Sequence, residues 1–322
     1  MGEGLITRRG SQEAPPSPYE ADMIQFFAIP GASGKVRLKV EKPVGSDGAM
    51  LRYKTSAWTS GDTKDTGTLI ASVTDDSSYD GANEWYEVSG LTNGTAYYFK
   101  AFPYSGTSYN ETIGANESHS KAGGLELEYT MDSISGSTLN DTSGNSRNGT
   151  IYDASATTGI VGNGMTAAGT SHRIASAYMA PSSSRTITAI VKMPSTTTTA
   201  LQTGLVYYGS AGFCYFGINV SGYEMQCNAN DGGIFTKSYS ANATCILAFG
   251  TTSDTAAWAK FDGDGRVTGS GTKNTNTSQN DLLNNAAITA RYMRGILDQY
   301  RVWSRSLEDY ELDNIYNGGM GC

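Results

Sequence analysis

Residues 295–319, GILDQYRVWSRSLEDYELDNIYNGG, constrain the fold more strongly than any other part of the sequence. Within their first half, apolar side chains share one parity and polar side chains take the other. The inward set is Ile296, Tyr300 and Val302, and the outward set is Gln299 and Arg301. This alternation predicts a core strand with one buried face. Asp298 has the inward parity, so we expect it to bind either loop backbone or an ion.

A short closing helix is expected directly after this strand. Ser306 can cap it, and Glu308 and Asp309 suit its first turn. The apolar stripe of the helix comprises Leu312, Ile315 and Tyr316, and its stop signal is the pair Gly318 and Gly319. A strand, a turn and one helix are therefore predicted in this part of the chain.

The composition of the 322 residues favours all-β structure in two domains. Gly, Ser, Thr, Asn and Tyr are abundant, only 17% of residues are charged, and long runs of helix formers are absent. The formal charge of -8 argues against a nucleic-acid partner, because binding to phosphates needs clustered Lys and Arg. The cysteines lack metal or disulfide spacing, so free and mostly buried thiols are expected. They are Cys214, Cys227, Cys245 and Cys322.

Residues 1–22 contain several Gly and Pro and offer little to bury. One interpretation is a disordered tail, and the other is a flexible docking arm that orders on a larger scaffold. The candidate anchors of such an arm are Leu5, Ile6, Arg8 and Arg9. The basic residues are not followed by an apolar segment, so no secretory signal peptide is predicted. No run approaches membrane-spanning length.

Residues 23–121 carry a pattern of strands. Val36, Leu38 and Val40 alternate with charged residues, which predicts a half-buried strand. The strands expected in this part of the chain include 36–41, 50–54 and 68–73. An Asn-Gly turn then leads into a further strand on which Tyr97, Phe99 and Ala101 share one face.

Residues 88–106, VSGLTNGTAYYFKAFPYSG, resemble part of a fibronectin type III domain. The E strand, EF turn and F strand of that family carry a Leu, a Gly-Thr pair and a corner tyrosine in this order. The resemblance implies that Tyr97 is the corner tyrosine and that its hydroxyl binds the backbone of the preceding turn. The segment is also similar to the fibronectin modules of bacteriophage virion proteins, in which the module is most often a spacer.

A short hinge at 122–124 is expected to precede a second domain over 125–322. This domain contains two alternating segments, one turn-rich loop and one hairpin pattern. The strands are expected within 125–129 and 186–192, the loop over 141–150, and the hairpin over 257–269.

These segments resemble, in the same order, the laminin-G-like, concanavalin-A-like jelly-roll family. The loop DTSGNSRNGT matches the family motif D-x-S-G-N-x-x-N-G-T at every fixed position. The segment 186–192 is similar to the motif T-I-S-A-W-V-K, with Ile190 in place of tryptophan. Residues 297–311 are similar to the closing I-D-x-V-R-I-Y strand and helix. The predicted fold class is therefore all-β, with a fibronectin type III-like sandwich, a concanavalin-A-like jelly-roll sandwich and one short C-terminal helix.

The resemblance also implies a possible structural Ca²⁺ ion, because that family often holds one near its first loop and last strand. The residues that could converge on it are Asp132, Asp141 and Asp298. For Asp298, hydrogen bonds to loop backbone are the alternative. The sequence Asp262-Gly263-Asp264-Gly265 lacks the remaining ligands of a calcium loop, so a tight hairpin is expected there.

No catalytic machinery is predicted. The chain has two histidines, His119 and His172, and no G-x-S-x-G, H-E-x-x-H or phosphate-loop motif. A glycan-cleaving enzyme needs two carboxylates at short spacing, and outside its terminal segments the second domain has no glutamate that forms such a pair on a strand. Such an enzyme is the lesser alternative, and its activity would be tested at Glu224.

Carbohydrate binding is the functional prediction that fits the second domain best. Proteins hold sugars with aromatic faces and fixed amide groups, and the central strands offer both. The candidate residues are Tyr207, Tyr208, Tyr215, Tyr223, Gln226, Asn228 and Asn230. For any single tyrosine, a place in the core or on the surface of a large sandwich is the alternative.

Together these features predict a virion surface protein of a bacteriophage, such as a fibre or decoration protein. Its arm would bind other virion proteins on the particle exterior, and its second domain would adhere to host-surface polysaccharide. Repeated copies, in a homo-oligomer, would strengthen weak sugar contacts. The alternative is a purely structural capsid, tail or filament protein that binds no sugar. Membrane insertion is not expected.

Overall fold

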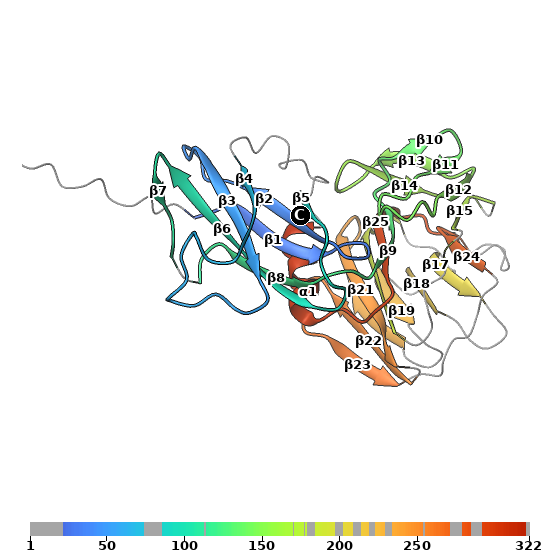
Figure 1. Ribbon diagram of the computed structural model, residues 1–322. Helices are drawn as coiled ribbons and strands as arrows, with labels where there is room; N and C mark the ends of the chain where they lie inside the picture. The colour runs from blue at the N-terminus through green and yellow to red at the C-terminus, as the bar shows by residue number, and fades with distance from the viewer. Residues whose placement is uncertain are drawn as a thin grey trace, which may run out of the picture.

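A computed structural model of the chain describes residues 22–73, 86–112, 114–169, 171–176, 178, 184–196, 202–208, 214–218, 223–228, 234–253, 255–270, 279–284 and 292–319. Within these ranges the fold is all-β apart from one short helical segment, which confirms the predicted fold class. The strands form two sandwiches, and the helix lies between them (Figure 1). Across the same ranges, no helix is long and apolar enough to span a membrane.

The first sandwich has two antiparallel sheets. The strands of one sheet, in spatial order, are β1 (Gln25–Pro30), β2 (Val36–Glu41) and β5 (Tyr86–Val88). The strands of the other are β4 (Thr68–Val73), β3 (Gly48–Lys54), β6 (Ala96–Ser105) and β7 (Ser108–Tyr109), with β8 (Glu117–Lys121) also paired to β6. Leu38, Leu51 and Phe99 belong to the core between these sheets. The three predicted strands within 36–73 are thereby confirmed.

The second sandwich is larger. Its helix-side sheet, which faces the helix, contains β13 (Ser155–Thr158), β14 (Asn163–Thr166), β25 (Ile296–Trp303), β16 (Arg185–Lys192), β21 (Thr244–Ser253), β22 (Ala256–Phe261) and β23 (Val267–Ser270), with β9 (Leu125–Tyr129) also paired to β25. Its distal sheet contains β10 (Ile134–Ser135), β11 (Thr138–Leu139), β12 (Gly149–Tyr152), β15 (Arg173–Ser176), β24 (Gln279–Leu282), β17 (Gln202–Tyr208), β18 (Cys214–Ile218), β19 (Glu224–Asn228) and β20 (Ile234–Ser238). Figure 1 shows β17 and β24 on the side away from the first sandwich.

The sequence alternation correctly predicts the central strand of the helix-side sheet. β16 pairs with β21 on one side and with β25 on the other. Its Ile187, Ala189 and Val191 all enter the main core between the two sheets of this sandwich. The hairpin predicted over 257–269 is also confirmed, because β22 and β23 pair antiparallel.

The closing strand β25 contains a β-bulge that simple alternation did not predict. Ala189 of β16 pairs with Tyr300. The next residue, Ile190, pairs with Asp298, which leaves Gln299 as the extra residue of the bulge. A bulge of this kind reverses the side-chain parity of everything that precedes it.

The prediction that Ile296 and Tyr300 share a core face is therefore wrong. Leu297 takes that place and joins Tyr300 and Val302 in the main core. Asp298 is fully buried, as its predicted inward position required, but on the opposite face of the sheet. The bulge thus moves an acid out of the apolar core without exposing it to water.

The second face of β25 is also buried, which the pattern of outward polar residues did not suggest. Gln299 and Arg301 are each 1% exposed. This face of the helix-side sheet carries a separate apolar cluster that includes Trp258 and Trp303. The helix covers this cluster, and Ile29 of the first sandwich is part of it. Strand β25, which was predicted to have one buried face, is therefore covered on both faces.

The closing helix α1 (Asp309–Asn314) continues into a wider helical turn, η1 (Ile315–Gly319). Leu312 and Ile315 pack into the cluster, as the predicted apolar stripe required. The cap prediction was wrong: Glu308 is the N-cap residue, and its backbone N–H donates to the Glu311 carboxylate at 2.9 Å. Ser306 instead donates its backbone N–H to Ser184 Oγ at 2.9 Å.

The prediction that β2 of the first sandwich is half-buried is wrong, because its outward residues are buried too. Its outward residues Arg37 and Lys39 are 8% and 5% exposed. Arg37 is covered because its guanidinium reaches Glu128 of the second sandwich. Tyr97, by contrast, behaves as predicted: its hydroxyl accepts a hydrogen bond from the backbone N–H of Thr92 at 3.0 Å.

Candidate functional site

Three of the seven predicted sugar-binding residues lie on the outer face of β18, β19 and β20, at one end of the distal sheet. Strand register places Tyr215, Asn228 and Ile234 directly opposite one another in a row across these strands. The neighbouring residues Phe216 and Cys227 point into the main core, so the row of Tyr215 and Asn228 faces outward. Ile234 is 54% exposed.

A second row on the same face joins Gly217, Gln226 and Thr236. The Tyr215 hydroxyl and Gln226 Oε1 are 3.0 Å apart, so the phenol proton is donated to this amide oxygen. Glu224 lies next along β19 and pairs with Ser238. The structure therefore brings three of the predicted residues together. They are Tyr215, Gln226 and Asn228, and we call the outer face of β18–β20 the amide face.

Asn228 is the distinctive residue of the amide face. It is 4% exposed, and its Oδ1 has no hydrogen-bond partner within the ranges that the structure describes. A buried polar atom without a partner typically costs about 1–3 kcal/mol. A hydrogen-bond donor at this position would recover that cost.

The other predicted sugar-binding residues are placed differently. Tyr223 packs against the main core, and its hydroxyl donates to the Ser195 carbonyl at 3.0 Å. Tyr207 pairs with Cys214 and Tyr208 with Gln279 through their backbones, in β17. Asn230 lies outside the described residues, as do the four predicted docking-arm residues.

Sequence reasoning missed Ile234 and Thr236, although the segment IFTKS alternates as a half-exposed strand should. Only the register of β20 against β19 places these two residues beside Asn228 and Gln226. Register depends on which strands become neighbours, so no local signal identifies the pair.

Asp298 binds loop backbone, the first of its two predicted alternatives. Its Oδ2 accepts the N–H groups of Ile160 and Val161 at 2.7 and 2.8 Å, and its Oδ1 accepts that of Gln299 at 2.7 Å. Burial raises the pKa of the Asp298 carboxyl above its ordinary value, and the three N–H donors oppose that rise. The carboxylate anchors the loop between β13 and β14 to the closing strand.

The other two candidate calcium ligands also bind backbone. Asp132 Oδ1 accepts the N–H of Asn163 at 2.7 Å. Asp141 holds its own loop, with Oδ1 accepting the N–H groups of Glu128 and Ser143 and Oδ2 accepting that of Arg147. Gly162 has φ 67°, and a side chain there would collide with the Asp132 carboxylate.

A calcium ion fits these carboxylates poorly, because both oxygens of Asp141 and Asp298 and one oxygen of Asp132 already accept backbone N–H groups. Among the described residues there is also no group of three or more His, Cys, Asp or Glu side chains that could hold a metal ion. The matching loop motif is thus accounted for here by a network of hydrogen bonds.

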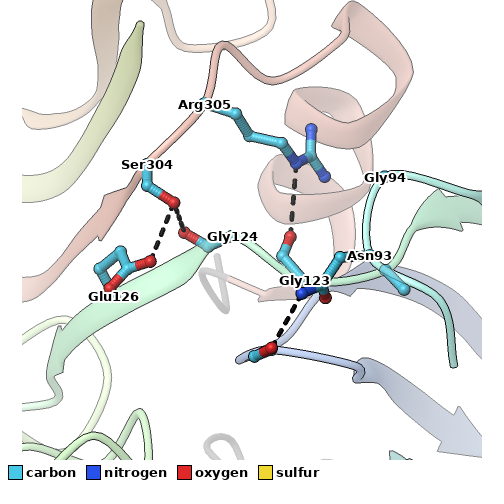
Figure 2. Close-up of a pocket in the computed structure, with 9 residues that line it drawn as sticks. Asn93, Gly94, Gly123, Gly124, Glu126, Ser304 and Arg305 are labelled. Carbon is cyan, nitrogen blue, oxygen red and sulfur yellow. Dashed lines mark hydrogen bonds between the residues drawn. The ribbon is translucent and has the colours of Figure 1, made fainter. Parts of the chain in front are cut away.

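A cavity of about 230 Å³ lies where the chain passes from the first sandwich to the second. Its lining residues are Ser33, Asn93, Gly94, Ala122, Gly123, Gly124, Glu126, Ser304 and Arg305. The polar groups satisfy one another, as Figure 2 shows. Ser304 Oγ donates to Glu126 at 2.9 Å, and Arg305 Nε donates to the Gly123 carbonyl at 3.3 Å. We therefore assign this cavity, which includes the predicted hinge, to the connection between the sandwiches.

The described part of the amide face carries one carboxylate, that of Glu224 on β19. Hydrolysis of a glycosidic bond requires a second, placed about 5–10 Å away. Among the other polar residues, His172 Nδ1 accepts the N–H of Ala168 at 3.4 Å, and Cys227 and Cys245 are buried.

Comparisons with known proteins give weak similarities. No protein-family model matches the sequence, and no curated protein matches it. Among solved structures, the binding domain of Paraclostridial Mosquitocidal Protein 1 is 13% identical with a TM-score of 0.48, over 60% of this chain and 52% of that one. The receptor binding domain of botulinum neurotoxin D is 12% identical with a TM-score of 0.47, over 61% and 53%.

Domain 4 of AbnA, a GH43 extracellular arabinanase from Geobacillus stearothermophilus in complex with arabinotriose, is 16% identical with a TM-score of 0.46, over 60% of this chain and 98% of that one. The aligned part of this chain spans about half the length of the two toxin domains. Similarity at this level assigns neither a ligand nor an activity.

Proposed function

We propose that the protein is a carbohydrate-binding adhesion protein that uses the amide face of its second sandwich. The observation that carries this proposal is the Asn228 amide oxygen, which is buried without a partner in the described structure beside the Tyr215–Gln226 hydrogen bond. Sugar recognition combines aromatic or apolar surface with a few fixed polar groups. Tyr215 and Ile234 supply the surface, and the two amides supply the polar groups.

We further propose that the protein works on the exterior of a bacteriophage particle. The support is the resemblance of 88–106 to phage fibronectin modules, together with an N-terminal segment suited to docking on other virion proteins. In that setting a homo-oligomer would present several amide faces at once, and avidity would compensate for weak single contacts. Neither nucleic-acid binding nor membrane insertion belongs to this proposal.

A purely structural virion role is the second candidate, and one specific observation favours it. The two sandwiches are joined by a buried ion cluster in which Glu128 binds both Arg37 and Arg301. A stiff two-domain body is what a spacer or decoration protein requires. Such a protein would bind no sugar.

The test of sugar binding is a glycan array probed with the whole protein. We expect retention on host-type polysaccharides, and an approximately tenfold weaker affinity for Tyr215→Ala, since one hydrogen bond and an aromatic contact are lost. Tyr109→Ala, in the first sandwich, is the matched control and should bind like the wild-type protein. Absence of binding across the array would favour the structural role.

Two further measurements separate the remaining alternatives. Mass spectrometry or immunogold microscopy should detect the protein on the outside of purified particles, and its absence from particles would contradict the virion proposal. An enzyme would release sugar from the polysaccharides that it binds, and this release would disappear in Glu224→Gln. We expect no release.

A further inference from the structure

We propose that two copies of this chain associate through the edge strand β23, so that their helix-side sheets join into one continuous antiparallel sheet. Such a dimer is independent of sugar binding. Three features of the edge support it: a strand open to pairing and bordered by apolar side chains, a sequence that is complementary to itself, and neighbouring charges that are already paired.

Strand β23 is the last strand of the helix-side sheet, beside β22 (Figure 1). In the described residues it pairs with β22 alone, which leaves the backbone groups along its other side available to a further strand. Its residues Val267–Ser270 are all exposed and include neither a charged residue nor a proline. Proteins usually protect such an edge with a charge, a proline or a bulge. This part of β23 has none of the three.

Apolar side chains border the same edge. A pocket of about 350 Å³ lies between β23 and β20, the last strand of the distal sheet. Val267 and Ile234 line it from these two strands, and each is 54% exposed. Phe235 and Phe261, which are buried, also line it. A second chain that added a strand at this edge would remove exposed apolar surface from water.

The register with β22 fixes the direction of each side chain of β23. Val267 pairs with Ala259, a residue of the main core, so it points to the core face of the sheet. Gly269 has the same parity. Thr268 pairs with Trp258 and points to the helix side.

This pattern is complementary to itself. Two antiparallel strands place side chains of the same face opposite one another. With a two-fold axis at Thr268, the Thr268 side chains of both copies face each other, which is a favourable cross-strand pair. Val267 of each copy then lies opposite Gly269 of the other, which leaves room for it. A Cβ at Gly269 would be 3.1 Å from Phe235 Cζ, so the valine also meets an aromatic edge. We therefore assign a second copy of this chain as the partner.

The charges beside the edge are paired within the chain. Arg266, which precedes β23, binds the Asp309 carboxylate at 2.8 Å. Lys237, which lines the pocket, binds Asp262 and Asp264 at 2.8 and 2.7 Å. A two-fold axis brings identical groups of the two copies toward one another, so unpaired charges there would repel. Internal pairing reduces this repulsion.

The experiment measures the molar mass of the whole protein by sedimentation equilibrium, up to about 100 μM, since a short edge predicts a weak dimer. We expect a monomer–dimer equilibrium. Thr268→Lys places two ammonium groups opposite each other, and its dimer dissociation constant should be at least about tenfold larger than that of the wild-type protein. The matched control is Thr150→Lys, at an exposed threonine of β12, which pairs on both sides, and it should dimerise like the wild-type protein. A monomer at every concentration, or a dimer that Thr268→Lys leaves unchanged, would overturn the proposal.

A pair of cysteine variants tests the register. In the proposed dimer, Thr268→Cys places two thiols opposite each other at a spacing that a disulfide can bridge, whereas Ser270→Cys places them about 14 Å apart along the strands. We expect disulfide-linked dimers of Thr268→Cys under mild oxidation, and no more of them in Ser270→Cys than in the wild-type protein. Equal crosslinking of the two variants, or crosslinking at residue 270 alone, would contradict the axis at Thr268. Either failure would leave the glycan-array result, and with it the proposed function, unaffected.

Discussion

The two outer faces of the second sandwich differ in whether other parts of the chain cover them. The outer face of the helix-side sheet carries buried ions and two fully buried tryptophans, covered by α1 and by the first sandwich. The outer face of β18–β20 carries amides, a tyrosine and the exposed Ile234, and the helix does not cover it. Both faces present polar residues at outward positions of the sequence pattern. The difference is in the charged groups, which on the helix-side sheet are paired with one another, although the Trp258 and Trp303 indole N–H groups have no partner in the described residues.

On the helix-side sheet, the partners come from distant parts of the chain. Glu128 accepts hydrogen bonds from Arg301 Nε at 2.7 Å and from Arg37 at 2.6 Å, and it is 3% exposed. Arg301 also donates to Gln299 at 2.8 Å. We call the three ions Arg37, Glu128 and Arg301 the ion cluster. On the amide face, Asn228 Oδ1 has no partner in the described residues, and neither the helix nor the first sandwich packs on this face. We therefore assign structure to the covered face and recognition to the other.

The ion cluster gives the largest expected effect. Glu128→Gln would leave two buried guanidinium groups without their shared anion, and breaking a buried ion pair costs about 3–5 kcal/mol. We expect the free energy of unfolding, measured in urea, to fall by that amount. A decrease in the free energy of unfolding of less than about 1 kcal/mol would mean that solvent screens the ion cluster like a surface ion pair. The helix-side face would then not differ from the amide face in the way we describe.

The pH dependence of the same variant sharpens the comparison. Burial by itself would raise the pKa of the Glu128 carboxyl, but Arg37 and Arg301 outweigh burial and hold the pKa far below its ordinary value of 4.5. The unfolded chain therefore binds this proton first as the pH falls. The contribution of the ion cluster is complete well above pH 4.5 and decreases below it.

We accordingly expect the difference in unfolding free energy between the wild-type protein and Glu128→Gln to be constant from about pH 7 to about pH 5.5, and to shrink below about pH 4.5. Urea titrations at a series of pH values measure this. Asp298 has the opposite effect on the pH dependence of stability, because burial raises the pKa of its carboxyl in the folded protein. The contribution of Asp298 to the free energy of unfolding therefore decreases as the pH rises through this raised pKa. A difference that grows in acid would contradict the assignment of Glu128 as a stabilised anion.

A second pair of acids tests how the helix is attached. The Glu311 carboxylate is fully buried and binds the Arg305 guanidinium at 2.6 Å and the backbone N–H of Lys121 at 3.0 Å. Glu308 pairs with Lys121 at 2.7 Å, but its side chain is 51% exposed. We expect Glu311→Gln to lower the free energy of unfolding by about 2 kcal/mol and Glu308→Gln by less than about 0.5 kcal/mol.

Thermal unfolding of the two variants under the same conditions gives the comparison. Because each substitution removes one negative charge from the same helical segment, a change in helix-dipole interaction affects both. Similar decreases in stability in the two variants would show that burial does not strengthen the hydrogen bonds and the ion pair of Glu311.

The smallest effect on stability, and the most informative for function, is expected at Asn228. Asn228→Leu replaces a buried amide whose oxygen lacks a partner with an apolar side chain of similar size. We expect the free energy of unfolding to stay within about 1 kcal/mol of the wild-type value or to rise, while sugar binding weakens about tenfold. A strong loss of stability would place Asn228 with the structural residues and remove the observation on which the proposed function rests.

Local features of the fold were predictable because they depend on neighbours in sequence. Period-two alternation identified β2, β16 and the β22–β23 hairpin, and the turn before β6 correctly indicated the Tyr97 hydrogen bond. The candidate site was predicted only in part. Tyr215, Gln226 and Asn228 come together, but Tyr223 turns into the core. Alternation alone does not state which side of a sheet another element will cover.

Side-chain spacing in the sequence by itself determined the all-β class, the short closing helix and the parity of β2 and β16. The two sandwiches were expected from the family resemblances. Only the tertiary structure decided which outer face is buried. The partners of Glu128 lie 91 and 173 residues away, and the bulge at Gln299 arises where β25 meets β16. Contacts at such separations form when whole elements pack, so the same polar alternation becomes a buried ion cluster on one sheet and a candidate sugar-binding face on the other.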